Sequence, residues 1–209
     1  MIDTMIDRTN AALRKIPTWV LYLLGALYPL WLLYLGSTGG LGADPVKALE
    51  HDLGERALQL LVLGLAVTPL RRFAGVNLMR FRRAIGVLTF TYVALHLLVW
   101  LVLDVQIISQ ILGDIAKRPY ITIGMAGFVL LLPLALTSNN VSVKRLGRRW
   151  KRLHLLTYPA ALLGGIHYVM LVKGFQIEPL IYLAVILALL ATRLSGGFGV
   201  MARSFGLKT

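Results

Sequence analysis

Long apolar stretches separated by short polar segments dominate the pattern of this chain. Six of them approach the roughly 20 residues that an α-helix needs to cross about 30 Å of hydrocarbon. We therefore predict an all-α membrane protein, a six-transmembrane-helix bundle that forms one domain over residues 1–209. The first stretch is longer than the apolar core of a signal peptide, so we expect it to remain as a span. The six predicted spans are 17–36, 56–70, 84–103, 120–137, 153–172 and 177–194.

The composition also indicates that the chain lies in a lipid bilayer. Hydrophobic residues make up 57% of the chain and charged residues only 15%, whereas a soluble domain carries about 25% charged residues. The chain contains no cysteine, which excludes disulfides, iron–sulfur clusters, thiolate zinc sites and haem attached through a C-x-x-C-H motif. A redox cofactor must therefore be held by histidine or by other groups without a thiol.

The positive charges alternate between the two sides of the predicted bundle. A net charge of +13 in a soluble protein would suggest nucleic acid, but in a membrane protein Lys and Arg collect in cytoplasmic loops. We therefore expect both termini to be cytoplasmic and no nucleic-acid partner. The predicted cytoplasmic charges are Arg8, Arg14, Lys15, Arg71, Arg72, Arg80, Arg82, Arg83, Lys144, Arg145, Arg148, Arg149, Lys151, Arg152, Arg193, Arg203 and Lys208, and those opposite are Lys47, Arg56, Lys117, Arg118 and Lys173.

The longest outer loop, residues 37–55, contains several glycines before the turn Asp44-Pro45. Proline suits the first position of a helix, so we expect a short interfacial helix over Val46–Leu53. No phosphate-binding Walker pattern or dinucleotide fingerprint occurs, and no soluble catalytic domain is expected after the last span.

Three of the four histidines fall in or at the edge of predicted spans, where an ionisable side chain marks a functional site by default. His96 and His167 lie on the third and fifth spans, which both run outward from a cytoplasmic charge cluster. Each lies about equally far into its span, so the two imidazoles should share one depth. Neutral imidazole is a good iron ligand, and two such rings can clamp one haem iron.

His154 should lie nearer the cytoplasmic face, at the level of Arg82 on the third span. Arg82 is then either a topology anchor or a partner for a haem propionate. A regular helix would place His154 and His167 on different faces, so the chain would need a bend at Pro159 or at Gly164-Gly165. The alternative for these histidines is ordinary hydrogen bonding across helices. His51, in the outer loop, is either a solvated residue or a contact for a partner or quinone.

Several local strings carry a family resemblance. The strings are Gly39–Lys47, Arg80–Arg83 with Gly86, Leu95–Leu97, Arg118–Tyr120, Thr137-Ser138, Leu146–His154, Ile166–Tyr168 and Pro179–Tyr182. In their order and context they resemble the MsrQ family of haem-binding membrane subunits of bacterial protein-methionine-sulfoxide reductase systems, a branch of the ferric-reductase-like transmembrane superfamily. The resemblance extends from about Leu21 to Leu190.

The resemblance implies a multi-pass protein of the bacterial inner membrane that carries one or two b-type haems (heme b), with FMN as a further possible cofactor. It implies that His96, His154 and His167 bind haem iron. Electrons are expected from the quinone pool or from a cytoplasmic flavin reductase. They are expected to pass to a periplasmic MsrP-type catalytic subunit, which holds the sulfoxide-reducing site and repairs oxidised periplasmic proteins.

One departure from the wider superfamily concerns Arg82. Relatives with two full histidine pairs carry a histidine at that level, so whether Arg82 ligates iron or anchors a propionate stays open.

Two other interpretations of the function remain open as well. A cytochrome b561-like quinol oxidoreductase normally uses two full pairs, and a small histidine-dependent transporter would be expected to carry membrane carboxylates, which the spans almost lack.

Overall fold

Helices make up all the regular structure in the described part of the chain. The computed structural model describes the backbone of residues 2–172 and 174–204 and the side chains of residues 4–172 and 174–193, so the side chains of Lys173, Arg203 and Lys208 lie outside it. This confirms the all-α prediction. The elements are α1 (Ile2–Lys15), α2 (Trp19–Ser37), α3 (Pro45–Phe73), η1 (Met79–Phe81), α4 (Arg82–Val99), the π-helical η2 (Trp100–Val105), α5 (Ile108–Lys117), α6 (Pro119–Leu136), α7 (Asn140–Leu146), α8 (Arg148–Leu153), η3 (His154–Leu156), α9 (Thr157–Leu171) and α10 (Ile177–Ser204).

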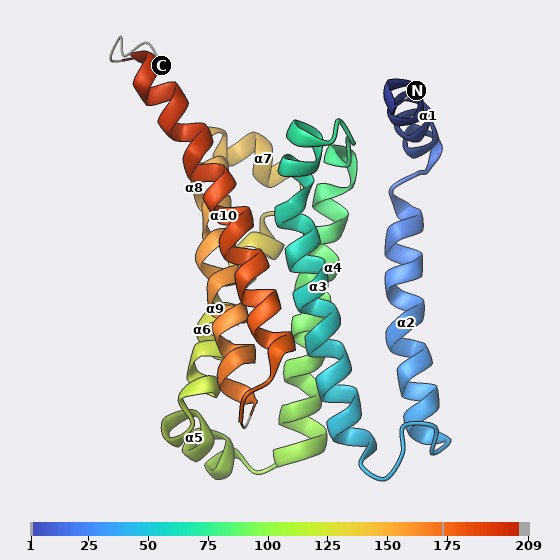
Figure 1. Ribbon diagram of the computed structural model, residues 1–209. Coiled ribbons are helices and arrows are strands. Elements are labelled where there is room, and N and C mark those ends of the chain that lie inside the picture. The colour runs from blue at the N-terminus through green and yellow to red at the C-terminus, as the bar shows by residue number, and fades with distance from the viewer. Residues whose placement is uncertain (1, 173, 205–209) are drawn as a thin grey trace.

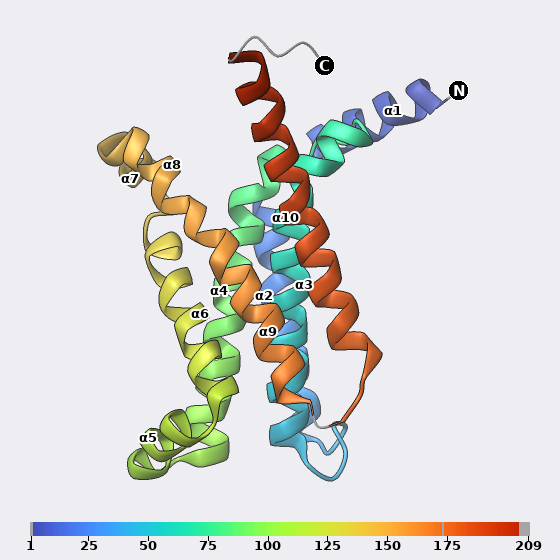
Figure 2. The ribbon, with the colours of Figure 1, turned by 60° about the vertical axis from the view of Figure 1, so that its left-hand side comes forward.

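The long helices run alongside one another as a bundle (Figure 1). α3 packs against α4, α6 packs against α9, and α10 lies against α9 and α3, while α2 stands beside α3 and α4. In the turned view α1 extends sideways from the end of the bundle at which α10 finishes, and α5 lies at the opposite end (Figure 2). We call these the α1 end and the α5 end.

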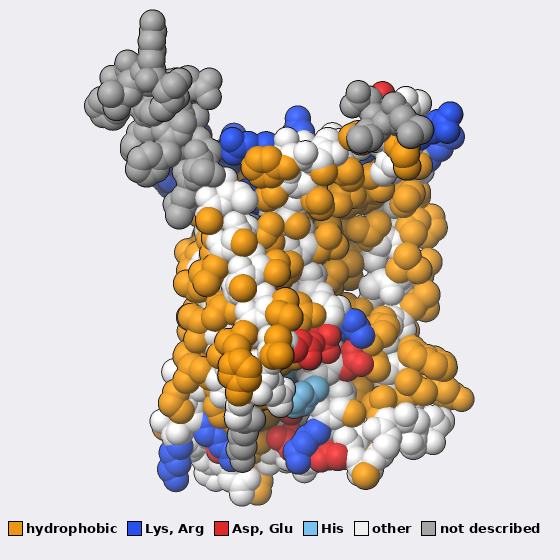
Figure 3. Space-filling view, in the orientation of Figure 1, with side chains coloured by type: hydrophobic (Ala, Val, Ile, Leu, Met, Phe, Trp, Pro, Cys, Tyr) orange, Lys and Arg blue, Asp and Glu red, His pale blue; other side chains and the backbone are white. Residues whose placement is uncertain are grey.

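The outside of the bundle is as apolar as its inside. Leu65 and Ile186 are fully buried between α3, α9 and α10, yet Trp19, Leu24 and Leu30 on α2 are each 61% exposed. Figure 3 shows hydrophobic side chains covering the flank, with most basic side chains near the two ends. A helix that is apolar all round is typical of a hydrocarbon environment.

Four helical segments are long and apolar enough to cross a membrane, counted over the described residues. They are α2, α3, the run Met79–Val105 and α6. The structure is therefore that of a helical membrane protein.

Helix α3 corrects one expectation. A separate interfacial helix over Val46–Leu53 is wrong, because α3 runs without a break from Pro45 to Phe73. Asp44 caps it, since its carboxylate accepts the backbone N–H of Lys47 at 3.2 Å. The charged first turns resemble a loop in the sequence, but the helix continues through them and accommodates Gly54 in its interior.

Truncating Leu65 tests which face of α3 points inward. Leu65 is 2% exposed and packs with Ala161 and Ile186, whereas Leu63 on the same helix is 39% exposed. We expect Leu65→Ala to cost about 2–5 kcal/mol of stability and Leu63→Ala within about 0.5 kcal/mol of zero. Unfolding of the detergent-solubilised protein measures both. Equal losses would show that the inward face of α3 is assigned wrongly.

Candidate functional site

His96 and His167 line the same cavity toward the α5 end of the bundle. This α5-end cavity has a volume of about 330 Å³, lies between α3, α4, α6 and α9, and is lined mainly by apolar side chains such as Val93, Phe128 and Leu131. His96 comes from α4 and His167 from α9. The structure therefore brings together the two histidines that the sequence placed at one depth.

The spacing of the two rings suits a shared metal. The ring centroids of His96 and His167 are 6.3 Å apart, and the ring planes cross at 78°. A metal–imidazole nitrogen bond is about 2 Å long, so two rings that share a metal lie within several ångströms of each other. A separation of 6.3 Å is therefore short enough for His96 and His167 to hold one metal between them.

Backbone carbonyls hold both rings. His96 Nδ1 donates to the carbonyl of Glu50 at 2.8 Å, and His167 Nδ1 donates to the carbonyl of Tyr120 at 2.7 Å. A carbonyl oxygen can only accept, so the proton resides on Nδ1 and the lone pair on Nε2. This tautomer and this second contact are typical of imidazoles that ligate metals.

The remaining donors favour a macrocycle over a bare ion. Among the described residues, no group of three or more His, Cys, Asp or Glu side chains is placed to hold a metal ion. Two imidazoles would leave most positions of an iron unfilled, and the nitrogens of a porphyrin would supply the others. The donor set and the apolar walls therefore fit haem.

Charged side chains gather around the α5-end cavity. Lys47, Glu50, His51, Asp104 and Arg118 all contribute to its lining. Arg118 pairs with Asp114 at 3.1 Å and donates to the Tyr120 hydroxyl at 3.2 Å, and this second contact raises the pKa of Arg118. His51, one of these lining residues, is exposed.

A second, larger cavity opens toward the α1 end. It has a volume of about 630 Å³, and it brings Arg82 of α4 together with His154. Five basic side chains line it besides His154, namely Arg80, Arg82, Arg83, Lys151 and Arg193. Such a surface suits an anionic group such as a propionate or phosphate.

Two neighbouring side chains hold the ring of His154. Its ring stacks on Trp150 with centroids 3.9 Å apart, and its Nε2 lies 3.2 Å from the Thr137 hydroxyl. Trp150 in turn donates to the Thr137 carbonyl at 2.9 Å. The short 3₁₀ turn His154–Leu156 interrupts the α-helix between the two histidines, and α9 then continues through Pro159 and the glycine pair. This turn lets His154 line one cavity while His167 lines the other.

Arg193 is a cavity residue that sequence reasoning missed. It was counted with the tail charges, yet it donates to the Leu65 carbonyl at 2.8 Å and to the Tyr158 hydroxyl at 3.3 Å. Its Nε is buried without a protein partner. Its position inside the predicted span 177–194 was the available signal, because an arginine at that depth requires partners.

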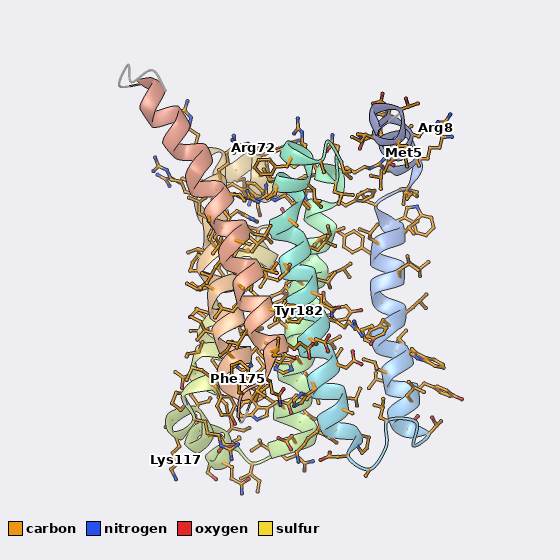
Figure 4. The ribbon with its side chains drawn as sticks, in the orientation of Figure 1. Met5, Arg8, Arg72, Lys117, Phe175 and Tyr182 are labelled. Carbon is orange, nitrogen blue, oxygen red and sulfur yellow. The ribbon has the colours of Figure 1, made fainter. Side chains whose placement is uncertain are left out.

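A polar cluster on the flank was missed too. Tyr28, midway along α2, donates to Asp52 at 2.6 Å, and Arg56 pairs with Asp52 at 3.3 Å. Gln59 continues the chain of contacts to Tyr182 of α10, which points toward α3 in Figure 4. These contacts tie α2, α3 and α10 together through polar groups within an apolar bundle.

Comparison with known proteins assigns the family. The family model for the ferric reductase like transmembrane component matches residues 53–165. The chain is 51% identical to the protein-methionine-sulfoxide reductase heme-binding subunit MsrQ of Brucella anthropi over 177 residues, covering 84% of this chain and 80% of that protein. The proteins of the same name from Brucella ovis and Brucella suis are also 51% identical, covering 85% of this chain and 81% of each. No solved structure matches the chain at a significant level. The chain therefore belongs to the MsrQ family, within the ferric-reductase-like transmembrane proteins.

Proposed function

We propose that this protein is a haem-binding electron-transfer subunit that carries electrons across the bacterial inner membrane to a methionine-sulfoxide reductase. The observation that carries the proposal is the His96–His167 pair, whose ring separation of 6.3 Å and Nδ1 contacts suit two axial ligands of one iron. The name of the Brucella relatives, a heme-binding subunit, agrees with this site.

The proposed topology has six spans, α2, α3, α4 with η2, α6, α9 and α10. An even number of crossings returns the chain to its starting side, and α1 lies at the end where α10 finishes (Figure 1). Arg8 and Arg72 mark this α1 end and Lys117 the opposite end (Figure 4). Because basic residues are concentrated at the α1 end, the positive-inside rule assigns it to the cytoplasm.

At the α5-end cavity the protein contributes the orientation of the ligands. The carbonyls of Glu50 and Tyr120 fix the tautomer of each ring, and mainly apolar side chains line the cavity beside them. When bound there, haem would supply one-electron redox chemistry, and with both histidines as ligands it would favour electron transfer over oxygen chemistry.

At the α1-end cavity, His154 and Arg82 would hold a second cofactor, either another b-type haem or FMN. His154 offers one imidazole, and Arg82, Arg80 and Arg193 offer cationic groups for a propionate or phosphate. Arg82 lies 14 residues before His96 on α4, which corresponds to about 21 Å of helix rise. The two levels therefore divide the membrane into two shorter electron-transfer steps.

The proposed electron path enters at the α1 end, from a cytoplasmic flavin reductase or from quinol. It leaves at the α5 end, near residues 37–55 and 113–118, where a periplasmic MsrP-type catalytic subunit would dock. Reduction of a sulfoxide to a thioether and water consumes two electrons and two protons. This chemistry belongs to the partner, and the chain described here supplies the electrons.

An optical spectrum of the purified protein, expressed with ample haem, tests the proposal. Dithionite should produce the bands of a reduced b-type haem, and extraction into pyridine should yield one or two haems per chain. Adding a trace amount of the catalytic subunit together with methionine sulfoxide should reoxidise all of the haem, while methionine sulfoxide alone should not. A protein without haem bands would overturn the proposal and favour a histidine-dependent transporter.

A further inference from the structure

One local arrangement occurs twice in the α5-end cavity. We propose that Gly54 and Gly124 are positioning residues for His96 and His167, because each leaves a gap through which an imidazole reaches a helix carbonyl. The inference rests on the proposed function in that it takes these histidines as the ligands of one haem. It identifies the glycine that allows each histidine to be held in place.

Each carbonyl that accepts an imidazole N–H lies four residues before a glycine. Glu50 precedes Gly54 on α3, and Tyr120 precedes Gly124 on α6. In an α-helix the carbonyl of residue i already accepts the N–H of residue i+4, so the imidazole must approach its second lone pair. The side chain of residue i+4 leans toward the helix N-terminus and would cover that approach. Glycine leaves it open.

The distances show how little room remains. A β-carbon at position 54 would lie 3.0 Å from His96 Nδ1 and 3.2 Å from its Cε1. A β-carbon at position 124 would lie 2.8 Å from His167 Nδ1 and 2.9 Å from its Cε1. Non-bonded atoms of this kind prefer about 3.5–4.0 Å, so either alanine would displace the ring.

Other glycines of the same cavity lack this relation. A β-carbon at Gly127 would meet Leu163 at 3.7 Å, and one at Gly164 would meet Leu58 at 3.6 Å, both ordinary contacts. Among the cavity glycines that the structure describes, only the two that follow the accepting carbonyls lie close to an imidazole.

The two arrangements also have nearly the same separation in the sequence. Glu50 lies 46 residues before His96, and Tyr120 lies 47 residues before His167. In both cases the accepting helix is packed along the helix that carries the histidine, α3 with α4 and α6 with α9. The cavity is thus built from two similar helix pairs, each contributing one ligand and the gap that holds it.

The gap also affects the chemistry of the ligand, because it allows the hydrogen bond between the imidazole and the carbonyl. An Nδ1–H that donates to a carbonyl makes the imidazole a more basic ligand and fixes its orientation. Pushing the ring away weakens that hydrogen bond, so the ferric state loses stabilisation and the midpoint potential of the haem rises. Loss of such supporting contacts typically lowers metal affinity about 10–100-fold.

The test compares Gly54→Ala and Gly124→Ala with two control variants. Gly113→Ala adds a β-carbon that meets nothing within 4 Å, and Gly25→Ala crowds the Leu88 side chain on α4 without reaching an imidazole. Haem per chain is measured on the monodisperse fraction of each protein, together with the midpoint potential of the haem that remains bound. The potential keeps the comparison informative even if a variant folds in low yield.

We expect both test variants to bind haem about 10–100-fold more weakly, to raise the potential, and to show the larger change for Gly124→Ala. Both controls should retain the haem content and potential of the unaltered protein. If the unaltered protein binds haem and the test variants match Gly113→Ala, the positioning role is wrong while the ligand pair stands. If Gly25→Ala changes the potential equally, the effect is general crowding and the inference fails. If the unaltered protein binds no haem, the proposed function itself is overturned.

Discussion

His96→Ala and His167→Ala should each remove the same haem. Both rings line one cavity with centroids 6.3 Å apart, so loss of either would leave a haem iron bound between them with a single protein ligand. We expect the spectrum of the α5-end haem to disappear or to become high-spin in both variants, while any signal from the α1 end stays. Reduced-minus-oxidised spectra of the two proteins, with extracted haem per chain, measure this.

His51→Ala is the control for that pair. His51 contributes to the same cavity lining, yet it is exposed and lies outside the imidazole pair. Its replacement should leave both spectra and haem content unchanged. Loss of different haems from the two test variants would show that His96 and His167 do not share an iron.

His154→Ala should give the second large effect, confined to the α1 end. The ring stacks on Trp150 beside a basic cavity, so its loss should empty that site and leave the α5-end haem in place. Reduction of the remaining haem by the physiological donor should slow by about tenfold or more, as for lost metal-site contacts, whereas dithionite should still reduce it. Stopped-flow reduction with each donor separates the two cases.

Arg82→Ala distinguishes the roles open to that residue. Loss of the α1-end haem or flavin alone would assign Arg82 to that cofactor. Unchanged spectra combined with poor membrane insertion would return Arg82 to topology. Extracted haem and flavin, counted separately, also identify which cofactor the α1-end cavity holds. If His154→Ala leaves both contents and the reduction rate unchanged, the α1-end site is wrong.

Much of the arrangement could be predicted from the sequence, because membrane helices have a strong apolar pattern and a known rise. Counting along two spans that run in the same direction was enough to place His96 and His167 at one depth. The same counting placed Arg82 level with His154, and both line the α1-end cavity. These predictions needed only helix geometry and the positions of the basic clusters.

Other features depend on tertiary contacts that no local pattern records. The charged residues at the start of α3 resemble a loop in sequence. In the structure, the Glu50 carbonyl accepts a hydrogen bond from His96 on α4, and the Asp52 carboxylate accepts one from Tyr28 on α2. The carbonyl partners of the two imidazoles lie 46 and 47 residues away, so their choice depends on how the helices pack. Arg193 likewise shows its role only once its partners, the Leu65 carbonyl and Tyr158, are known.

Electron paramagnetic resonance of the oxidised His154→Ala protein tests the central claim most directly, because only the α5-end haem should remain in it. With histidine labelled by ¹⁵N, the iron should give a low-spin ferric signal coupled to two imidazole nitrogens. That result would establish His96 and His167 as joint axial ligands. A high-spin signal, or coupling to one histidine only, would contradict the shared iron and with it the proposed path for electrons.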